Sequence, residues 1–170
     1  MSTPPAAAAP PLPREKVEHF DREVAAIVKR YPAERKSAAL MPVLRAAQEL
    51  FGHLSPEVQR LAATRVGVSP ARVDEVATFY VMFNTRPVGR HVVELCTNVS
   101  CCLTGSERIW AHLRSRLGVK AGETTADGRI TLREVECLGS CGTAPAMLID
   151  DEMHERLTVE KVDEILGRLE

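Results

Sequence analysis

Four of the five cysteines fall into two close pairs, and this spacing is the strongest chemical feature of the sequence. Cys96 and Cys101 are separated by four residues, Cys137 and Cys141 by three, and 35 residues lie between the pairs. A [2Fe-2S] cluster has two irons, and each iron needs two protein thiolates. Two chelating pairs from distant segments match this demand, so the spacing predicts one [2Fe-2S] cluster, with one iron held by each pair.

The chain segments around the two pairs also suit a cluster. The first pair is expected to span the end of a strand and the start of a helix, where unpaired amide groups can point at sulfur. The second pair lies in the run CLGSCGTAP, where Gly139 and Gly142 let backbone amides come close to the sulfur atoms. Such N–H to sulfur hydrogen bonds tune the reduction potential of a cluster.

Two other roles for the cysteines are open from spacing alone. Four thiolates also suit a structural zinc ion, although the C-x4-C pair is wider than the usual tight zinc knuckle. A thiol-disulfide enzyme is disfavoured, because there is no C-x-x-C motif and no cationic residue adjoins the cysteines to lower a thiol pKa. The main alternative to a cluster is therefore a zinc-stabilised module.

The remaining candidate ligands are weaker. Cys102 is expected to be a small buried apolar residue, or else a substitute ligand that could replace Cys101 after a one-residue shift. The five histidines show no ligand spacing, and only His91, at the start of the strand that ends at Cys96, could act near the metal. Two acids before Cys137 are interpreted as a solvated strand face. No catalytic residue is predicted.

Composition limits the classes of protein that need to be considered. The net charge is -1, which gives no overall electrostatic reason to expect a nucleic acid or an anionic membrane as partner. No apolar run approaches the roughly 18 residues of a membrane helix. Residues 1–13 hold five of the eleven prolines and lack the pattern of a secretory signal, so we expect a disordered tail and a reducing compartment.

Helical periodicity dominates residues 14–85, which we interpret as an N-terminal helical domain. Apolar residues recur at three- and four-residue steps from residue 14 to residue 31 and again from about residue 37 to residue 51. Ser55-Pro56 and Ser69-Pro70 are each typical of a helix start, with an N-cap hydroxyl before a proline. The run Arg86-Pro87-Val88-Gly89 is expected to be a linker.

Residues 90–170 change to a mixed pattern. Strands are expected at 91–96, 130–136 and 146–150, and helices at 104–117 and from residue 159 onward. The order β-α-β-β-α predicts a small mixed sheet with helices packed on it. The fold class is therefore α+β (α/β), a helical bundle followed by a small sheet domain that carries the cysteines.

Three runs of this sequence resemble a known family. They are VATFYVMFNTRPVGRHVVELCTNVSC, the helix start LTGSE, and VECLGSCGTAPAMLIDDEMHERLT. Together they look like the E-type subunits of bacterial NADH-quinone oxidoreductase, respiratory complex I, a family that includes the mitochondrial 24 kDa subunit. The resemblance covers nearly everything after the proline-rich tail. Cys102 is a departure, because family members more often carry an apolar residue there.

The resemblance implies a thioredoxin-like domain with one [2Fe-2S] cluster, whose ligands fall on Cys96, Cys101, Cys137 and Cys141. It also implies a role in electron transfer as a subunit of the NADH dehydrogenase module, without a complete active site on this chain. FMN and NADH would bind to a partner flavoprotein subunit, through which electrons reach the iron-sulfur subunits. The complex would lie in the cytoplasm, on the cytoplasmic face of the inner membrane, without membrane insertion by this chain.

Close relatives of that family serve in NAD-reducing hydrogenases and NAD-dependent formate dehydrogenases, so the equivalent small subunit of one of these is an alternative. The absence of a G-x-G-x-x-G or Walker motif agrees with flavin and nucleotide sites on a partner. The apolar run 76–83 is interpreted as core, with part of it hypothesised to contact the flavoprotein.

A cluster-sensing DNA-binding protein is a rival from a different class. Residues 54–79 could form a helix-turn-helix around Gly67. However, the second helix would present Asp74 and Glu75 against only Arg72, which is the wrong charge balance for a DNA groove.

Overall fold

A computed structural model describes residues 11–169, and the chain divides into two compact units. Met1–Pro87 is called the helical unit and Val88–Glu170 the sheet unit. We predicted a disordered tail at residues 1–13, and residues 1–10 of it lie outside the described residues. Leu12 packs against the core of the helical unit. Among the described residues, no helix combines the length and apolar character needed to cross a membrane.

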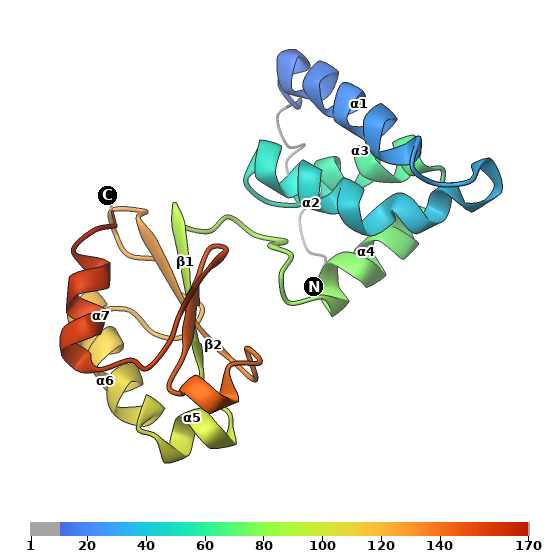
Figure 1. Cartoon of the computed structure of the whole chain (residues 1–170). Helices are drawn as coiled ribbons and strands as arrows, with labels where there is room; N and C mark the ends of the chain where they lie inside the picture. Colours follow the sequence, from blue (N-terminus) through green and yellow to red (C-terminus); the bar gives the residue numbers. More distant parts are fainter. Residues whose placement is uncertain (1–10, 170) are drawn as a thin grey trace, which may run out of the picture. The chain divides into compact units, whose positions relative to one another are not determined.

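The helical unit is built of helices that pack against one another (Figure 1). Their apolar side chains form one core. Its elements are α1 (Arg14–Val28), the 3-10 helix η1 (Ala33–Ala39), α2 (Leu40–Phe51), α3 (Pro56–Val66) and α4 (Pro70–Phe79). The Ser55 hydroxyl accepts the Val58 N–H at 3.3 Å, and the Ser69 hydroxyl accepts the Arg72 N–H at 3.2 Å. Both helix starts predicted from Ser-Pro are therefore confirmed.

The C-terminal end of α4 and the segment after it expose apolar side chains on a fixed backbone. Phe79 and Val81 are 77% and 80% exposed. The Gln48 side chain donates to the Met82 carbonyl at 3.0 Å and accepts the Asn84 N–H at 2.6 Å, which ties the segment to α2. Phe79 and Val81 are therefore not core, whereas Val76, Ala77 and Phe83 of the same 76–83 run are buried in the core of the helical unit.

The sheet unit places helices against a mixed sheet. Its elements are β1 (His91–Cys96), α5 (Val99–Leu103), α6 (Ser106–Leu117), β2 (Ile130–Val135), the 3-10 helix η2 (Cys141–Thr143), β3 (Met147–Ile149), β4 (Glu152–His154) and α7 (Val159–Leu166). Within residues 11–169 the strands form one sheet of four in the order β2-β1-β3-β4. β1 is parallel to β2 and antiparallel to β3, which is antiparallel to β4. Helices α6 and α7 lie side by side against the sheet (Figure 1).

Alternation along β1 separates the core from the opposite sheet face. Val93 and Leu95 are fully buried and pack with α6 and α7 in one apolar cluster. Cys96, the next residue, belongs to a second, smaller buried cluster. Successive strand residues point to opposite faces, so the strand packs its core with one face and carries the first cysteine on the other.

The parallel pairing of β1 with β2 brings the C-terminal ends of both strands to the same end of the sheet. The register runs from His91 opposite Ile130 to Cys96 opposite Val135. At the start of the pair, a Cβ on Gly89 would lie 2.9 Å from the Arg129 backbone, so only glycine allows this approach. Cys137 follows the last residue of β2 by two positions and therefore lies at the same end of the sheet as Cys96.

The α+β fold class predicted from the sequence is confirmed, with two local differences. The helix expected at 104–117 is found as α6, and the short helix α5 before it was not predicted. Gly105, in the left-handed region at φ +100°, separates the two helices. The strand β4 was not predicted, since its three residues are mostly exposed and carry no alternating pattern.

Candidate metal centre

The first cysteine pair is buried where a strand passes into a helix. Cys96 ends β1 and is 3% exposed, and Cys101 lies in α5 and is 2% exposed. The Cys96 thiol donates to the Glu136 carbonyl at 2.9 Å, and Ala146 completes the small buried cluster around both sulfurs. A free thiol at this depth behaves as a small apolar side chain until a metal displaces its proton.

The start of α5 is shaped by an asparagine. Asn98 is the N-cap, and its side-chain oxygen accepts the Val99 N–H at 2.8 Å. The Asn98 amide also donates to the Glu136 carboxylate at 3.2 Å. These contacts join the α5 start to the chain segment after β2, so that the first pair and the approach to the second pair are held together.

The second cysteine pair lies at the surface. Cys137 follows β2, Cys141 begins η2, and both thiols are exposed. Their sulfur atoms are 3.7 Å apart. The Gly139 N–H donates to the Cys137 sulfur at 3.4 Å, from a backbone at φ +79° that a glycine adopts without strain. The loop therefore directs a backbone amide at sulfur.

The Cys101 thiol is influenced by cysteines of both pairs. Burial raises the pKa of the Cys101 thiol, and its neighbour Cys96 raises it further through a side-chain hydrogen bond. Negative charge on Cys96 or Cys141 acts in the same direction, while the Ala146 amide opposes the increase. The pKa of Cys101 therefore responds to charge on Cys141, a cysteine of the second pair, which indicates that the two pairs lie near each other.

The separation within the second pair fits two thiolates on one iron. Tetrahedral coordination with metal–sulfur bonds of about 2.3 Å places two sulfurs about 3.8 Å apart. The Sγ atoms of Cys137 and Cys141 are separated by 3.7 Å. Among residues 11–169, no three His, Cys, Asp or Glu are grouped to hold a single metal ion. Two pairs of thiolates, Cys96 with Cys101 and Cys137 with Cys141, are the set that a two-iron cluster takes.

Cys102 differs from the expectation that it is a buried apolar residue. It is exposed, and its sulfur lies 3.6 Å from the Glu107 carboxylate. The negative charge of Glu107 raises the pKa of this thiol. The prediction of burial was wrong because Cys102 follows Cys101 on a helix, where consecutive residues point in different directions and only Cys101 faces the core.

His91 lies at the far end of β1 from Cys96. Its Nδ1 atom is 2.8 Å from the Asp150 carboxylate. Five residue steps of a strand separate it from Cys96 by about 16 Å. A role beside the metal is therefore not supported for His91.

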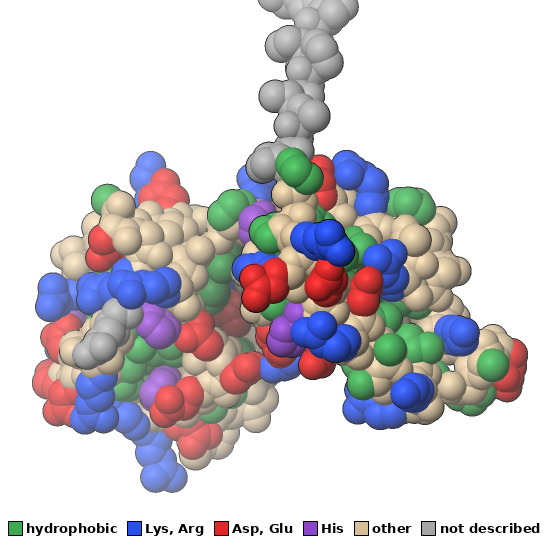
Figure 2. All heavy atoms as spheres, turned by 90° about the horizontal axis from the view of Figure 1, so that it is seen from above, with side chains coloured by type: hydrophobic (Ala, Val, Ile, Leu, Met, Phe, Trp, Pro, Cys, Tyr) green, Lys and Arg blue, Asp and Glu red, His purple; other side chains and the backbone are tan. Residues whose placement is uncertain are grey.

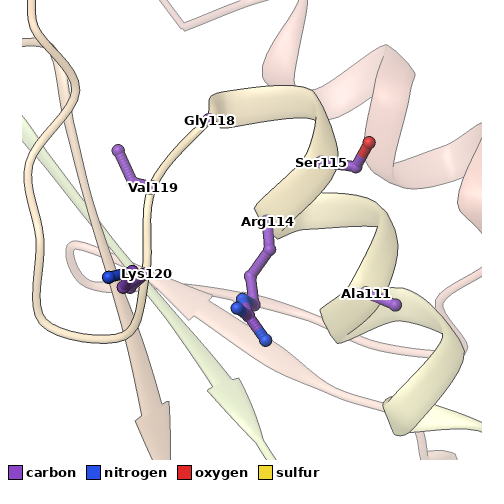
Figure 3. Close-up of a pocket in the computed structure, with 6 residues that line it drawn as sticks. All are labelled: Ala111, Arg114, Ser115, Gly118, Val119 and Lys120. Atoms are coloured by element: carbon purple, nitrogen blue, oxygen red, sulfur yellow. The ribbon is translucent and has the colours of Figure 1, made fainter.

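A surface hollow at the C-terminal end of α6 contains none of the cysteines (Figure 3). It is lined by Ala111, Arg114, Ser115, Gly118, Val119 and Lys120. The carbonyl end of a helix carries partial negative charge, which Arg114 and Lys120 complement. This hollow and the four cysteines thus lie in different places. We take the cysteines, and not the hollow, as the candidate site.

Comparison with known proteins assigns the chain to a family. The family model of the thioredoxin-like [2Fe-2S] ferredoxins matches residues 24–170. The chain belongs to this family. Its α+β architecture is therefore the thioredoxin-like fold, as the sequence resemblance predicted, and the family implies a [2Fe-2S] cluster.

Curated relatives narrow the likeness further. The E-type subunit 2 of the NADH-quinone oxidoreductase of Rhizobium meliloti is 46% identical over 144 residues, which cover 85% of this chain and 84% of the relative. Subunit 2 of the Thermus thermophilus NADH-quinone oxidoreductase is 39% identical over 141 residues, covering 82% of this chain and 78% of the relative. The chain is thus a homologue of the E-type subunits of NADH-quinone oxidoreductase, as predicted.

A solved structure carries the same fold in another enzyme. One chain of the NAD⁺-reducing [NiFe]-hydrogenase in the air-oxidised state matches with a TM-score of 0.65 and 25% sequence identity. The match covers 74% of this chain but only 22% of the hydrogenase chain.

The sequence pointed to the four cysteines as candidate ligands, but not to the residues that support them. Ala146 and Asn98 were not singled out, and neither were the polar residues that hold the second loop. Asn98 could have been found, because an asparagine before a short helix is a typical N-cap. The contacts between the Cys137–Cys141 loop and Glu155, which follows β4, join residues far apart in the sequence and leave no local sequence pattern.

Proposed function

We propose that the chain binds one [2Fe-2S] cluster through Cys96, Cys101, Cys137 and Cys141. The observation that carries this proposal is the pairing of the thiols, with a buried pair at the end of β1 and a surface pair 3.7 Å apart at the end of β2. Family membership supports the identity of the cluster. The structural zinc alternative has no comparable support from the relatives.

The difference in burial gives the two proposed iron positions different roles. Cys96 and Cys101 would hold one iron in an apolar environment, while Cys137 and Cys141 would hold the other at the protein surface. Electron transfer between proteins needs a short path, and the surface pair provides the shorter path to a partner. The Gly139 amide adds a hydrogen bond to sulfur, which stabilises negative charge there.

We further propose that the chain is the [2Fe-2S] subunit of an NADH-quinone oxidoreductase, working next to a flavoprotein subunit that binds FMN and NADH. NADH delivers a hydride, which carries two electrons, and a flavin can divide this pair into single electrons. A [2Fe-2S] cluster accepts single electrons. Through the flavoprotein the chain would connect to the iron-sulfur subunits of the electron-input module, on the cytoplasmic face of the inner membrane.

The flavoprotein contact is proposed to include the exposed C-terminal end of α4 and the segment after it. Phe79 and Val81 are 77% and 80% exposed, and Gln48 holds the following backbone through two hydrogen bonds. An apolar surface on a fixed backbone loses little conformational freedom when a partner covers it. This is the arrangement expected of a protein contact rather than of a flexible connection.

A second candidate is the corresponding part of an NAD-reducing hydrogenase. It is favoured by the hydrogenase chain that shares this fold at 25% identity. An NAD-dependent formate dehydrogenase remains a prediction from the sequence resemblance. The cluster and the flavoprotein contact would be common to all three complexes, so these alternatives differ in the other subunits of the assembly. The rival DNA-binding function is disfavoured, because Arg72 is paired with Glu75 at 3.0 Å. On the face seen in Figure 2, basic and acidic side chains are also interspersed.

The proposed function is tested by electron transfer into the cluster. The full chain would be purified anaerobically with its flavoprotein partner, treated with NADH, and examined by EPR spectroscopy. We expect a rhombic signal of a reduced [2Fe-2S] cluster from the wild-type pair and its loss in a Cys137→Ser variant. A signal that NADH generates without the flavoprotein, or one that survives Cys137→Ser unchanged, would contradict the proposal. Copurifying subunits distinguish the quinone-reducing, hydrogenase and formate dehydrogenase assemblies.

A further inference from the structure

The loop that carries Cys137 and Cys141 has few apolar contacts to hold it. Both cysteines are exposed, and the 3-10 turn that begins at Cys141 is only three residues long. Leu138 and, at the end of the loop, Ala144 pack against the small buried cluster of the first cysteine pair. A surface loop of this kind needs polar contacts to keep two ligands at a fixed separation.

A single carboxylate supplies two of those polar contacts. The Thr143 hydroxyl donates to Glu155 Oε1 at 2.6 Å, and the Ser140 hydroxyl donates to the same oxygen. The two hydroxyl oxygens are 2.5 Å apart. Ser140 directly precedes Cys141, and Thr143 follows it by two residues. Glu155 therefore holds the chain on both sides of this cysteine.

Glu155 is itself fixed to the sheet unit. Its backbone carbonyl accepts a hydrogen bond of 2.6 Å from the ammonium group of Lys161, a residue of α7. The next two residues bond to the cysteine loop through the backbone: the Arg156 N–H donates to the Thr143 carbonyl at 2.8 Å and the Leu157 N–H to the Pro145 carbonyl at 3.0 Å. Leu157 is 5% exposed and belongs to the main core of the unit. The carboxylate thus connects the loop to the folded core.

The charge state of Glu155 suits this role. Hydrogen bonds from Ser140 and Thr143 hold the pKa of Glu155 below its usual range. An ionised carboxylate is an acceptor only, so both hydroxyls can donate to it at neutral pH. The hydroxyls are then oriented toward Glu155.

We propose that Glu155 is a positioning residue for the cluster: through Ser140 and Thr143 it keeps Cys141 at the separation from Cys137 that iron binding requires. This inference rests on the proposed function, since it assigns a role toward the proposed cluster. Residues that orient metal ligands typically change metal affinity by about 10–100-fold when they are removed.

The test uses the full chain with its cluster reconstituted without air. Two variants remove the contact from opposite sides, Glu155→Ala and the double variant Ser140→Ala with Thr143→Val. Glu164→Ala is the matched control, since it removes another exposed carboxylate, from α7, without touching the loop. The rate of cluster loss to an iron chelator is followed by the visible absorbance, and EPR spectra are recorded after reduction.

We expect both variants to lose the cluster about 10-fold faster or more than the wild type, while Glu164→Ala behaves as the wild type. Cluster loss at the wild-type rate in both variants would overturn the proposal. So would faster loss in Glu155→Ala alone, because that result would indicate an effect of charge rather than of the hydrogen bonds to the loop.

A second measurement separates this proposal from the cluster assignment. Hydrogen exchange of the amides in residues 138–143 is compared between wild type and Glu155→Ala without any cluster. Faster exchange confined to this loop supports the role of Glu155 in holding the loop, whether or not the wild type takes up a cluster. A wild type that takes up no cluster contradicts only the proposed function. Unchanged exchange in the variant contradicts the role of Glu155 itself.

Discussion

The strongest test of the fold that positions the cysteines is a pair of identical substitutions at opposite extremes of burial. Leu95 is fully buried on β1, next to Cys96, and Leu103 is 82% exposed on α5. Leu95→Ala leaves every cysteine in place but opens a cavity in the core of the sheet unit. Leu103→Ala removes the same atoms from the surface and is the control.

The expected magnitude follows from burial. A fully buried Leu→Ala change costs about 3 kcal/mol, from lost transfer free energy and the cavity that remains. For a domain of roughly 60–100 residues, each kcal/mol lowers Tm by about 4–8 °C, so we expect a decrease of about 12–24 °C. The exposed Leu103 should change stability by no more than about 0.5 kcal/mol.

The assay can report on the sheet unit alone. Trp110 is the single tryptophan of the chain and packs against the core that contains Leu95. Its fluorescence during thermal unfolding of the full, cluster-free chain therefore follows this unit and not the helical one. An equal decrease in Tm for both variants, or no decrease for Leu95→Ala, would refute the assignment of β1 as the strand that joins the core to the first cysteine.

Three further outcomes are expected. Because Cys102 is exposed, Cys102→Ser should leave the iron content of the full chain unchanged, and a lower iron content would show that it is a ligand. Hydrogen bonds from Arg65 lower the pKa of Asp21 from 3.8. This partly exposed pair should therefore contribute under about 1 kcal/mol to stability above that pH. The contribution is lost as the pH falls through the lower, folded-state value, so acid unfolding of Asp21→Asn, followed by circular dichroism, should lack this component; an unchanged profile would contradict it. Finally, Phe79→Ser with Val81→Ser should weaken copurification of the flavoprotein subunit without unfolding the chain, and full retention of the partner would exclude this surface.

The parts of the fold that local patterns determine could be predicted from the sequence. β1 was predicted at the residues where it is found, because a β-rich run there leads directly into a cysteine. The Ser-Pro helix starts were likewise predictable, since their N-cap bonds lie within three residues. The short helix α5 was missed because five residues carry too little apolar periodicity to predict a helix, and Gly105 at φ +100° separates it from α6.

The parts of the site that depend on tertiary contacts could not be predicted. Spacing suggested which cysteines pair, but not that one pair is buried and the other exposed, because burial depends on the neighbours that the fold supplies. The link from Glu155 to the hydroxyls beside Cys141 joins residues that are 12 and 15 positions apart in the sequence. No periodicity or motif connects them, and only the folded chain brings them together.

The most direct test of the central claim is the iron and acid-labile sulfide content of the full chain, purified without air and compared with its zinc content. We expect two irons and two sulfides for each chain, and no stoichiometric zinc. One zinc with no sulfide would contradict the cluster and would instead indicate a zinc-stabilised module.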